Sequence, residues 1–237
     1  MTCRKFSGAY PPFTGSNSSA AVFNYAPMDR YKETFETWNK IAVQYQELFM
    51  DLDLYNDSYD LICNSIPRNN PKILELGCGP GNITKYLLSK RPDFEIFATD
   101  NAPNMIALAK KNNPQAAFAC MDCRHIDTLK TKFDGIVCGF CLPYLSPEDS
   151  QKLISDCADL LNDNGLLYIS FVAGDPAKSG YQSSSTGDRS YFYFHDLDNL
   201  KATLTGCGFG DLTILNVAYK KPEKEAEIHT IITAKKK

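Results

Sequence analysis

The stretch ILELGCGPGN, residues 73–82, holds the feature that decides the fold of this chain. An apolar run suited to a buried strand carries one carboxylate, Glu75, and then breaks into glycines at positions 77, 79 and 81. Such a loop turns sharply and lets a ligand touch the backbone, because glycine has no Cβ in the way. The residues that follow Asn82 are spaced as in a helix, whose first N–H groups would point at that ligand. The stretch therefore predicts a strand, a binding loop and a helix.

The same alternation of apolar runs and helical patterns continues to the C-terminus. Strands are predicted at 72–77, 95–100, 115–122, 133–140 and 166–173, helices at 82–90, 103–112, 146–165 and 196–209, and an antiparallel pair at 211–219 and 227–234. Alternating units of this length indicate an α/β fold with a mostly parallel sheet and helices on both faces. In such sheets, ligands bind at the carboxyl ends of the strands.

The chain before this pattern divides in two. Residues 1–27 are rich in Pro, Gly, Ser and Asn without periodicity, which predicts a flexible N-terminal extension, and Met28 could be the biological start. From 28 to 71, apolar residues recur at helical spacing and predict an N-terminal helical cap. Residues 72–237 then form the core, in which the aromatic-rich segment 175–195 is expected to be a lid.

Composition narrows the class of partner. A net charge of −3 and a pI near 5.7 argue against nucleic acid, whose phosphates would require a basic face. No apolar run approaches the roughly 18 residues needed to cross a bilayer, and no secretory signal is evident, so no membrane partner is expected. Nine cysteines scattered through apolar segments are typical of reduced thiols and favour a cytoplasmic protein. The pattern gives no oligomeric state.

The carboxylate of Glu75 distinguishes between two kinds of ligand. A dinucleotide fingerprint G-x-G-x-x-G would place its third glycine at position 82, where this chain has Asn82. A pyrophosphate would also meet the like charge of Glu75 at close range, whereas an ammonium or a sulfonium would be attracted to it. The loop therefore predicts a cationic ligand, and it disfavours an NAD-dependent oxidoreductase on a similar fold, which is kept as an alternative.

With this loop in place, LELGCGPG (74–81) resembles motif I of the class I S-adenosylmethionine-dependent methyltransferases, specifically those acting on small molecules. The acid after the second strand, Asp100, and the acid after the third, Asp122, match positions that bind the ribose and the adenine in that family. The segment KFDGIVCGFCLPYLSPED (132–149) is similar to motif IV, and LLNDNGLLYIS (160–170) to the segment after it. The resemblance covers residues 72–172 and implies a Rossmann-like, seven-stranded sheet whose first five strands are parallel, with a reversed C-terminal hairpin.

The resemblance also implies a set of cofactor-binding residues for S-adenosylmethionine and its product S-adenosylhomocysteine. They are Tyr45, Glu75, Gly77, Cys78, Gly79, Gly81, Asp100, Asn101, Met105, Asp122, Cys123, Phe140 and Leu142.

Candidate bases are few, because the chain has three histidines. His195 ends the predicted lid, where loops of the family form the acceptor pocket, and it is the candidate catalytic residue; its alternative is a core neighbour of the Asp196 helix cap. His229 alternates along a late strand and is expected to be structural. A base is needed only if the acceptor must lose a proton, because methyl transfer from a sulfonium has a good neutral leaving group.

Two C-x-x-C units, Cys120–Cys123 and Cys138–Cys141, approach a zinc-ribbon spacing. They follow the third and fourth strands, which would stand three strand spacings apart, roughly 14 Å, so no metal is predicted.

The loop after the fourth strand reads GFCLPY (139–144) and lacks the polar residue and first proline of amino-directed nucleic-acid methyltransferases. The sequence therefore predicts transfer of a methyl group to an unidentified small-molecule acceptor. A non-catalytic cofactor-binding protein remains open.

Overall fold

The computed structural model describes residues 29–183, 187–220 and 226–237. Its central sheet has seven strands in the order β3-β2-β1-β4-β5-β9-β8. The predicted extension 1–27 and the alternative start at Met28 lie outside the described residues.

The strands of the sheet are β1 (Lys72–Leu76), β2 (Glu95–Asp100), β3 (Ala117–Cys120), β4 (Phe133–Cys138), β5 (Leu161–Val172), β8 (Phe209–Tyr219) and β9 (Glu227–Lys236). The first five are parallel to one another, as predicted. The C-terminal antiparallel pair is also confirmed. Because β9 lies between β5 and β8 and is antiparallel to both, β8 runs in the direction of the first five strands and β9 against them.

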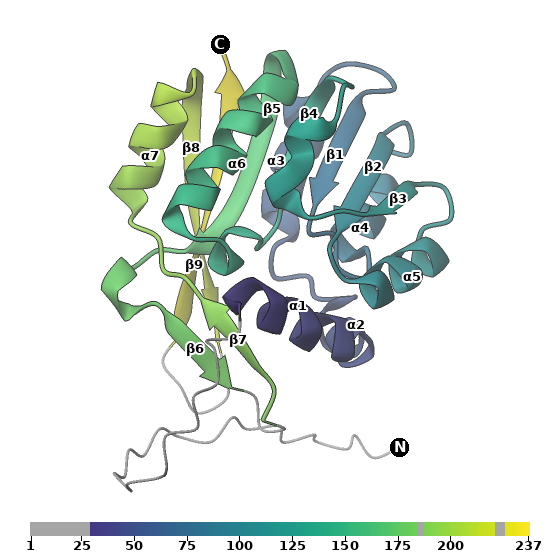
Figure 1. The fold of residues 1–237 in the computed structure, drawn as a ribbon. Coiled ribbons are helices and arrows are strands. Elements are labelled where there is room, and N and C mark those ends of the chain that lie inside the picture. Colours follow the sequence, from purple (N-terminus) through teal and green to yellow (C-terminus); the bar gives the residue numbers. More distant parts are fainter. Residues whose placement is uncertain (1–28, 184–186, 221–225) are drawn as a thin grey trace, which may run out of the picture.

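Helices cover both faces of this sheet (Figure 1). One face packs against α3 (Asn56–Ser65), α4 (Asn82–Lys90) and α5 (Pro103–Asn112), and the other against α6 (Pro147–Leu160) and α7 (Leu197–Gly206). The alternation within β1 shows why both faces are covered. Ile73 is buried against the side of α3, α4 and α5, and the next residue, Leu74, against the side of α6 and α7. The predicted α/β fold with helices on both faces is confirmed.

The helix predicted within 146–165 ends earlier than expected. The sequence placed Leu161 in its buried stripe and Gly165 just past its end, but α6 ends at Leu160 and β5 begins at Leu161. The start of α6 is as expected, since the Ser146 side chain accepts from Asp149 N. Leu161 pairs with Phe133 of β4, so the sheet extends into a segment whose local pattern is helical.

The segment predicted as a cap comprises α1 (Arg30–Lys40), α2 (Ala42–Phe49) and α3. Of these, α1 and α2 lie at the carboxyl edge of the sheet, and so does the described part of the segment predicted as a lid (Figure 1). The described part of the segment predicted as a lid contains a separate two-stranded sheet, β6 (Gly180–Ser183) and β7 (Arg189–Phe192). The two are joined: Arg189 forms an ion pair with Glu33 of α1, and Tyr191 N donates to Thr34 Oγ1 at 3.0 Å.

Candidate functional site

The glycine loop after β1 adopts the sharply turned backbone that its sequence predicts. Gly77, Gly79 and Gly81 all have positive φ, at 63°, 53° and 84°, a region that side chains with a Cβ rarely adopt. A Cβ on Gly77 would stand 2.4 Å from Cys141 Sγ. Gly81 then caps α4, so the first N–H groups of that helix face the loop.

Glu75 is fully buried beneath this loop. Its Oε2 accepts from Thr84 Oγ1 at 2.5 Å, while Oε1 has no partner among the described residues. Burial, with a smaller contribution from nearby Asp100, raises the pKa of Glu75 to about 8, against the lowering by the hydrogen bonds from Thr84. An unsatisfied buried carboxylate oxygen is costly unless a donor reaches it. The arrangement therefore fits a ligand that brings a cationic donor.

Asp100 ends β2 and braces the loop directly. Its Oδ2 accepts from Gly79 N at 2.9 Å and its Oδ1 from Ala102 N at 2.8 Å. Burial raises its pKa, and these two backbone donors partly offset that effect. A carboxylate has about four acceptor positions, so lone pairs remain for hydroxyl groups of a ligand. Asn101, the next predicted residue, is exposed, and its carbonyl accepts from Cys120 Sγ.

The cap places an aromatic group over the same loop. The ring of Tyr45, on α2, lies 3.5 Å from the point where a Cβ on Gly79 would stand. Tyr45 packs edge-on against Trp38 with ring centroids 5.5 Å apart, and both contact a cluster that includes buried Met105 of α5. The structure thus brings predicted residues Tyr45, Gly79 and Met105 together.

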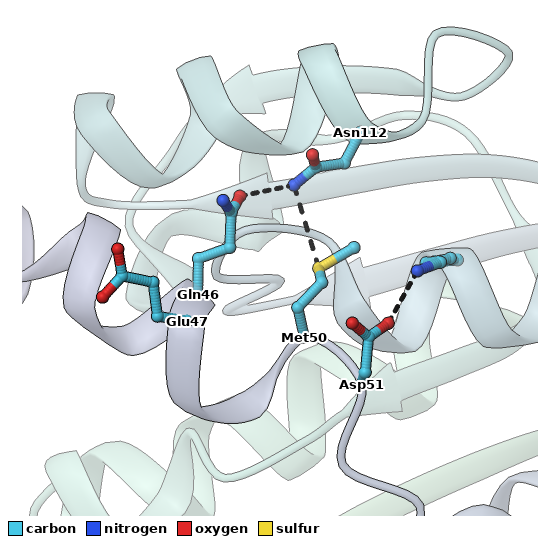
Figure 2. Close-up of a pocket in the computed structure, with 6 residues that line it drawn as sticks. Gln46, Glu47, Met50, Asp51 and Asn112 are labelled. Atoms are coloured by element: carbon cyan, nitrogen blue, oxygen red, sulfur yellow. Dashed lines mark hydrogen bonds and ion pairs between the residues drawn. The ribbon is translucent and has the colours of Figure 1, made fainter. Parts of the chain in front are cut away.

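Polar contacts fasten the cap at a pocket between α2, α4 and α5 (Figure 2). The Asn112 amide donates to Gln46 Oε1 at 2.7 Å and to Pro80 O at 2.9 Å, so one side chain ties α2 to the glycine loop. Lys85 and Asp51 form an ion pair at 2.8 Å on the opposite wall. Helix α2 and the glycine loop are therefore linked through hydrogen bonds to the same Asn112 side chain.

Asp122 has a partner of its own in this structure. Its carboxylate accepts from the Arg124 guanidinium at 2.6 Å and from Arg124 N at 2.9 Å, capping a short 3₁₀ helix, η1 (Cys123–Thr128). Burial would raise the pKa of Asp122, but Arg124 outweighs it and the pKa is lowered. Its role at an adenine ring stays a prediction.

The expected separation of the two C-x-x-C units was wrong. Cys123, at the start of η1, and Cys141, after β4, lie close enough for their thiols to interact. The strand-spacing argument failed because both residues sit in loops beyond the strands, and these loops converge over the carboxyl end of β1, where Cys141 Sγ donates to Leu76 O. Within residues 29–183, 187–220 and 226–237, no group of three His, Cys, Asp or Glu side chains could hold a metal ion.

The loop after β4 is held from two sides. Phe140 has a φ of 56° and its N–H donates to Ser170 Oγ at 2.8 Å. Leu142 is fully buried, and its carbonyl accepts from His195 Nε2 at 2.7 Å. A carbonyl only accepts, so this nitrogen carries the hydrogen. His195 is 4% exposed and its pKa is lowered by burial. Its catalytic role stays a prediction, while its contacts show that it positions the loop.

We expect His195→Ala to lower the free energy of unfolding by about 2–4 kcal/mol, because it opens a cavity and removes one of the two hydrogen bonds that the Leu142 carbonyl accepts, the other coming from Leu145 N. His195→Gln should cost less than half as much, since its amide can donate to that carbonyl. The buried imidazole has a pKa below its unfolded value, so its contribution is full above pH about 6.5 and is lost as pH falls. Urea unfolding at pH 7.5 and 5.5 measures the loss of unfolding free energy in each variant and its dependence on pH. Equal losses of unfolding free energy in His195→Ala and His195→Gln would contradict this positioning role.

Sequence reasoning missed several residues around the loop. Thr84 binds Glu75, and Asn113 Nδ2 donates to Gly81 O at 2.9 Å. Trp38 has a buried Nε1 with no partner among the described residues. Only Trp38 carried a signal, as a residue seven positions before Tyr45 on the apolar side of the cap. Cys78, a predicted residue, is buried and contributes through its backbone, with its N–H donating to Thr99 O.

Comparison with known proteins identifies relatives of this chain. Residues 73–165 match the methyltransferase domain family. A carboxy-S-adenosyl-L-methionine synthase of Campylobacter jejuni subsp. jejuni is 26% identical over 148 residues, 59% of this chain and 62% of that protein. The chain spans between 49% and 62% of the length of the first curated relatives that it matches.

Solved structures share the fold across most of the chain. A magnesium protoporphyrin IX methyltransferase from Synechocystis with bound S-adenosylmethionine superposes with a TM-score of 0.67 at 16% identity, covering 90% of this chain and 100% of that one. A 1,6-didemethyltoxoflavin-N1-methyltransferase of Burkholderia thailandensis with bound S-adenosylhomocysteine gives 0.66 at 18% identity, with 92% and 93% covered. The class I methyltransferase fold predicted from the sequence is confirmed. None of the helices in the described residues is long and apolar enough to span a membrane.

Proposed function

Because residues 73–165 carry a methyltransferase domain within a class I fold, we propose that the protein transfers a methyl group from S-adenosylmethionine to a small-molecule acceptor. The observation that supports this most directly is the fully buried oxygen of Glu75 that has no partner in the described part of the chain and lies beside three left-handed glycines. An ammonium donor satisfies that oxygen, and the glycines leave room for the rest of the methionine portion.

The residues present fit this cofactor. The Glu75 carboxylate would hold the ammonium, Asp100 would accept from ribose hydroxyls while bracing Gly79, and Tyr45 would cover the bound molecule. Bound S-adenosylmethionine supplies an activated methyl group on a sulfonium, which leaves as a neutral thioether. The chain itself contributes orientation and exclusion of water, which are the main requirements of such a displacement.

The acceptor side is proposed to lie between the cap at 28–71 and the lid at 175–195. Support comes from the contacts that join them, including Lys40 to Asp188 at 2.8 Å and Thr37 Oγ1 to Arg189 O at 2.6 Å. Further support is that α1, α2, β6 and β7 all lie at the carboxyl edge of the sheet (Figure 1). A small-molecule acceptor, no nucleic-acid partner and a cytoplasmic location are proposed on the acidic charge balance and the cysteine usage.

Calorimetric titration of the purified chain tests the proposal. S-adenosylmethionine and S-adenosylhomocysteine are expected to bind, with a dissociation constant in the micromolar range, and NAD is expected not to bind at the same concentrations. Transfer of labelled methyl groups to a panel of small phenols, amines and thiols then separates an enzyme from a non-catalytic cofactor-binding protein. Binding of NAD in preference to both sulfur nucleosides would overturn the proposal.

A further inference from the structure

Three polar side chains form a chain of hydrogen bonds from the cap to the last strand of the sheet. Tyr55 Oη lies 2.6 Å from His229 Nδ1, and His229 Nε2 lies 3.1 Å from Glu227 Oε1. Tyr55 precedes α3, and His229 stands near the start of β9, paired with Val172 at the carboxyl end of β5. Tyr55 and His229 are each 7% exposed. His229, expected to be structural, therefore lies at the edge of the sheet where ligands bind.

The chemistry of the three groups fixes the direction of these bonds. A carboxylate only accepts, so His229 Nε2 carries the hydrogen and donates to Glu227. In the neutral imidazole, His229 Nδ1 is then left with a lone pair and accepts from the Tyr55 hydroxyl. A hydroxyl has one hydrogen and two lone pairs, so Tyr55 Oη can still receive a proton from a ligand.

Aromatic rings surround this chain of hydrogen bonds. Phe140 lies in the loop over the predicted cofactor site. The centroid of its ring is 5.4 Å from that of Tyr55 and 4.8 Å from that of the His229 imidazole. Tyr219, at the end of β8, lies 5.1 Å from His229 with its plane inclined by 16°. Flat apolar surfaces of this kind pack against a flat aromatic ligand.

We propose that Tyr55, His229 and Glu227 form a proton relay that deprotonates an aromatic hydroxyl acceptor. The inference rests on the proposed methyl transfer and names the class of its acceptor. The acceptor O–H bond breaks as its proton passes to Tyr55 Oη, and the Tyr55 proton passes to His229 Nδ1. The acceptor oxygen keeps the electron pair and forms the bond to the methyl carbon, while the carbon–sulfur pair returns to sulfur. Tyr55 is the catalytic residue, and His229 and Glu227 are positioning residues.

Methyl transfer to an aromatic hydroxyl requires that the hydroxyl lose its proton. A phenol ionises near pH 10, so an aromatic hydroxyl is protonated and weakly nucleophilic at neutral pH. Burial is the largest cause that raises the pKa of Tyr55, and Tyr45 and Tyr168 beside it are raised in the same way. These phenols do not ionise alone at neutral pH. The neighbouring imidazole provides a proton acceptor, and the carboxylate of Glu227 stabilises the imidazolium that forms.

The spectrum of bound 4-nitrophenol tests the relay without knowledge of the natural acceptor. The probe is titrated into protein saturated with S-adenosylhomocysteine, and its phenolate absorbance is followed against pH. We expect the bound probe to ionise about one pH unit or more below the free probe, a tenfold change in its ionisation constant. Tyr55→Phe and His229→Gln should abolish this shift, with affinity for S-adenosylhomocysteine within about twofold of the original chain. The probe 4-nitrotoluene, which has no acidic proton, controls for binding of the ring alone.

The outcomes separate the relay from the proposed function. Absence of S-adenosylhomocysteine binding in the original chain would overturn the proposed function. If that nucleoside binds but 4-nitrophenol does not, the aromatic acceptor is wrong. If the probe binds and ionises as it does in solution, or shifts equally in both variants, the relay is wrong while the methyltransferase proposal stands. Tyr55→Phe removes one oxygen atom, so it keeps the test available if His229→Gln does not fold.

Discussion

Replacing Glu75 with Gln is expected to abolish the release of a proton that accompanies S-adenosylmethionine binding. In the unliganded protein the pKa of Glu75 is about 8, so the carboxyl is mostly protonated at pH 7. A bound ammonium favours the carboxylate, lowers this pKa and expels the proton. Linkage then requires the affinity to rise with pH below 8, by at most about tenfold per unit.

The affinity should also fall in the Glu75→Gln variant. A neutral amide loses the charge-assisted hydrogen bond to the ammonium, which we expect to cost about 2–4 kcal/mol of binding free energy. Calorimetry in two buffers of different ionisation enthalpy measures the proton count, between pH 6 and 7.5, below the titration of the ligand amine at about 7.7–8.0. Glu95→Gln, at an exposed position of β2, is the matched control and should change neither quantity. Equal proton release in the original chain and in Glu75→Gln would contradict the assignment.

The same substitution should stabilise the unliganded protein in alkali. The folded pKa of Glu75 is raised above its usual value of 4.5, so the folded protein binds the extra proton. The contribution of protonated Glu75 to the free energy of unfolding is therefore full below pH about 4.5 and is lost as the pH rises towards 8. Gln carries no such dependence. Thermal unfolding at pH 5 and pH 9 should show the variant near the original chain in acid and above it in alkali. A residue that is costly to the empty fold and useful to the ligand is typical of a binding site.

The sequence predicted the glycine loop and Glu75 because both belong to one local unit. A strand, a turn with positive φ and a helix are specified within residues 72–90, so residue type and spacing carry the information. The same holds for Asp100, whose place at the end of β2 follows from the strand pattern. Local periodicity was sufficient wherever the partners lie in adjacent elements.

Contacts between distant segments were not predictable in this way. The ion pair between Glu33 and Arg189 joins residues 156 positions apart, and nothing local marks either partner. The thiols of Cys123 and Cys141 meet because two loops converge beyond their strands, a geometry that strand spacing alone misjudges. Side-chain partners of this kind depend on how the cap and the loops fold over the sheet.

The position of His229, unlike those contacts, could have been inferred from the sequence prediction. The last two strands were predicted to form a reversed hairpin, so one of them had to run against the parallel strands, and a strand of that direction begins at the carboxyl edge of the sheet. A residue near the start of that strand is therefore at the ligand-binding edge, whatever its alternation. The contacts with Tyr55 and Phe140 follow from this position. The direction of the strand that carries His229, considered together with its periodicity, would have indicated that His229 lies at the ligand-binding edge of the sheet.

Gly81→Ala is expected to destabilise the protein by more than the left-handed backbone alone would cost. Gly81 has a φ of 84°, and a Cβ there would lie 2.4 Å from Asn113 Nδ2 and 3.4 Å from the backbone of Ala109. The left-handed conformation alone costs roughly 1–2 kcal/mol for a residue with a Cβ. Displacing the buried Asn113 amide, which donates to Gly81 O, adds the loss of a buried hydrogen bond. We expect a total of about 3–4 kcal/mol in the free energy of unfolding and at least a tenfold loss of affinity for S-adenosylmethionine.

Gly208→Ala provides the matched control, because Gly208 has the same φ of 84° and no atom within 4 Å of its missing Cβ. It should cost about 1–2 kcal/mol and leave the affinity unchanged, since Gly208 follows α7 far from the loop in sequence. The difference between the two variants measures the steric conflict at Gly81. Adding Asn113→Ala to Gly81→Ala removes that conflict, so the double variant should lose less stability than the sum of the two single variants. Additive losses, or equal losses at Gly81 and Gly208, would show that backbone strain and not the Asn113 contact confines position 81 to glycine.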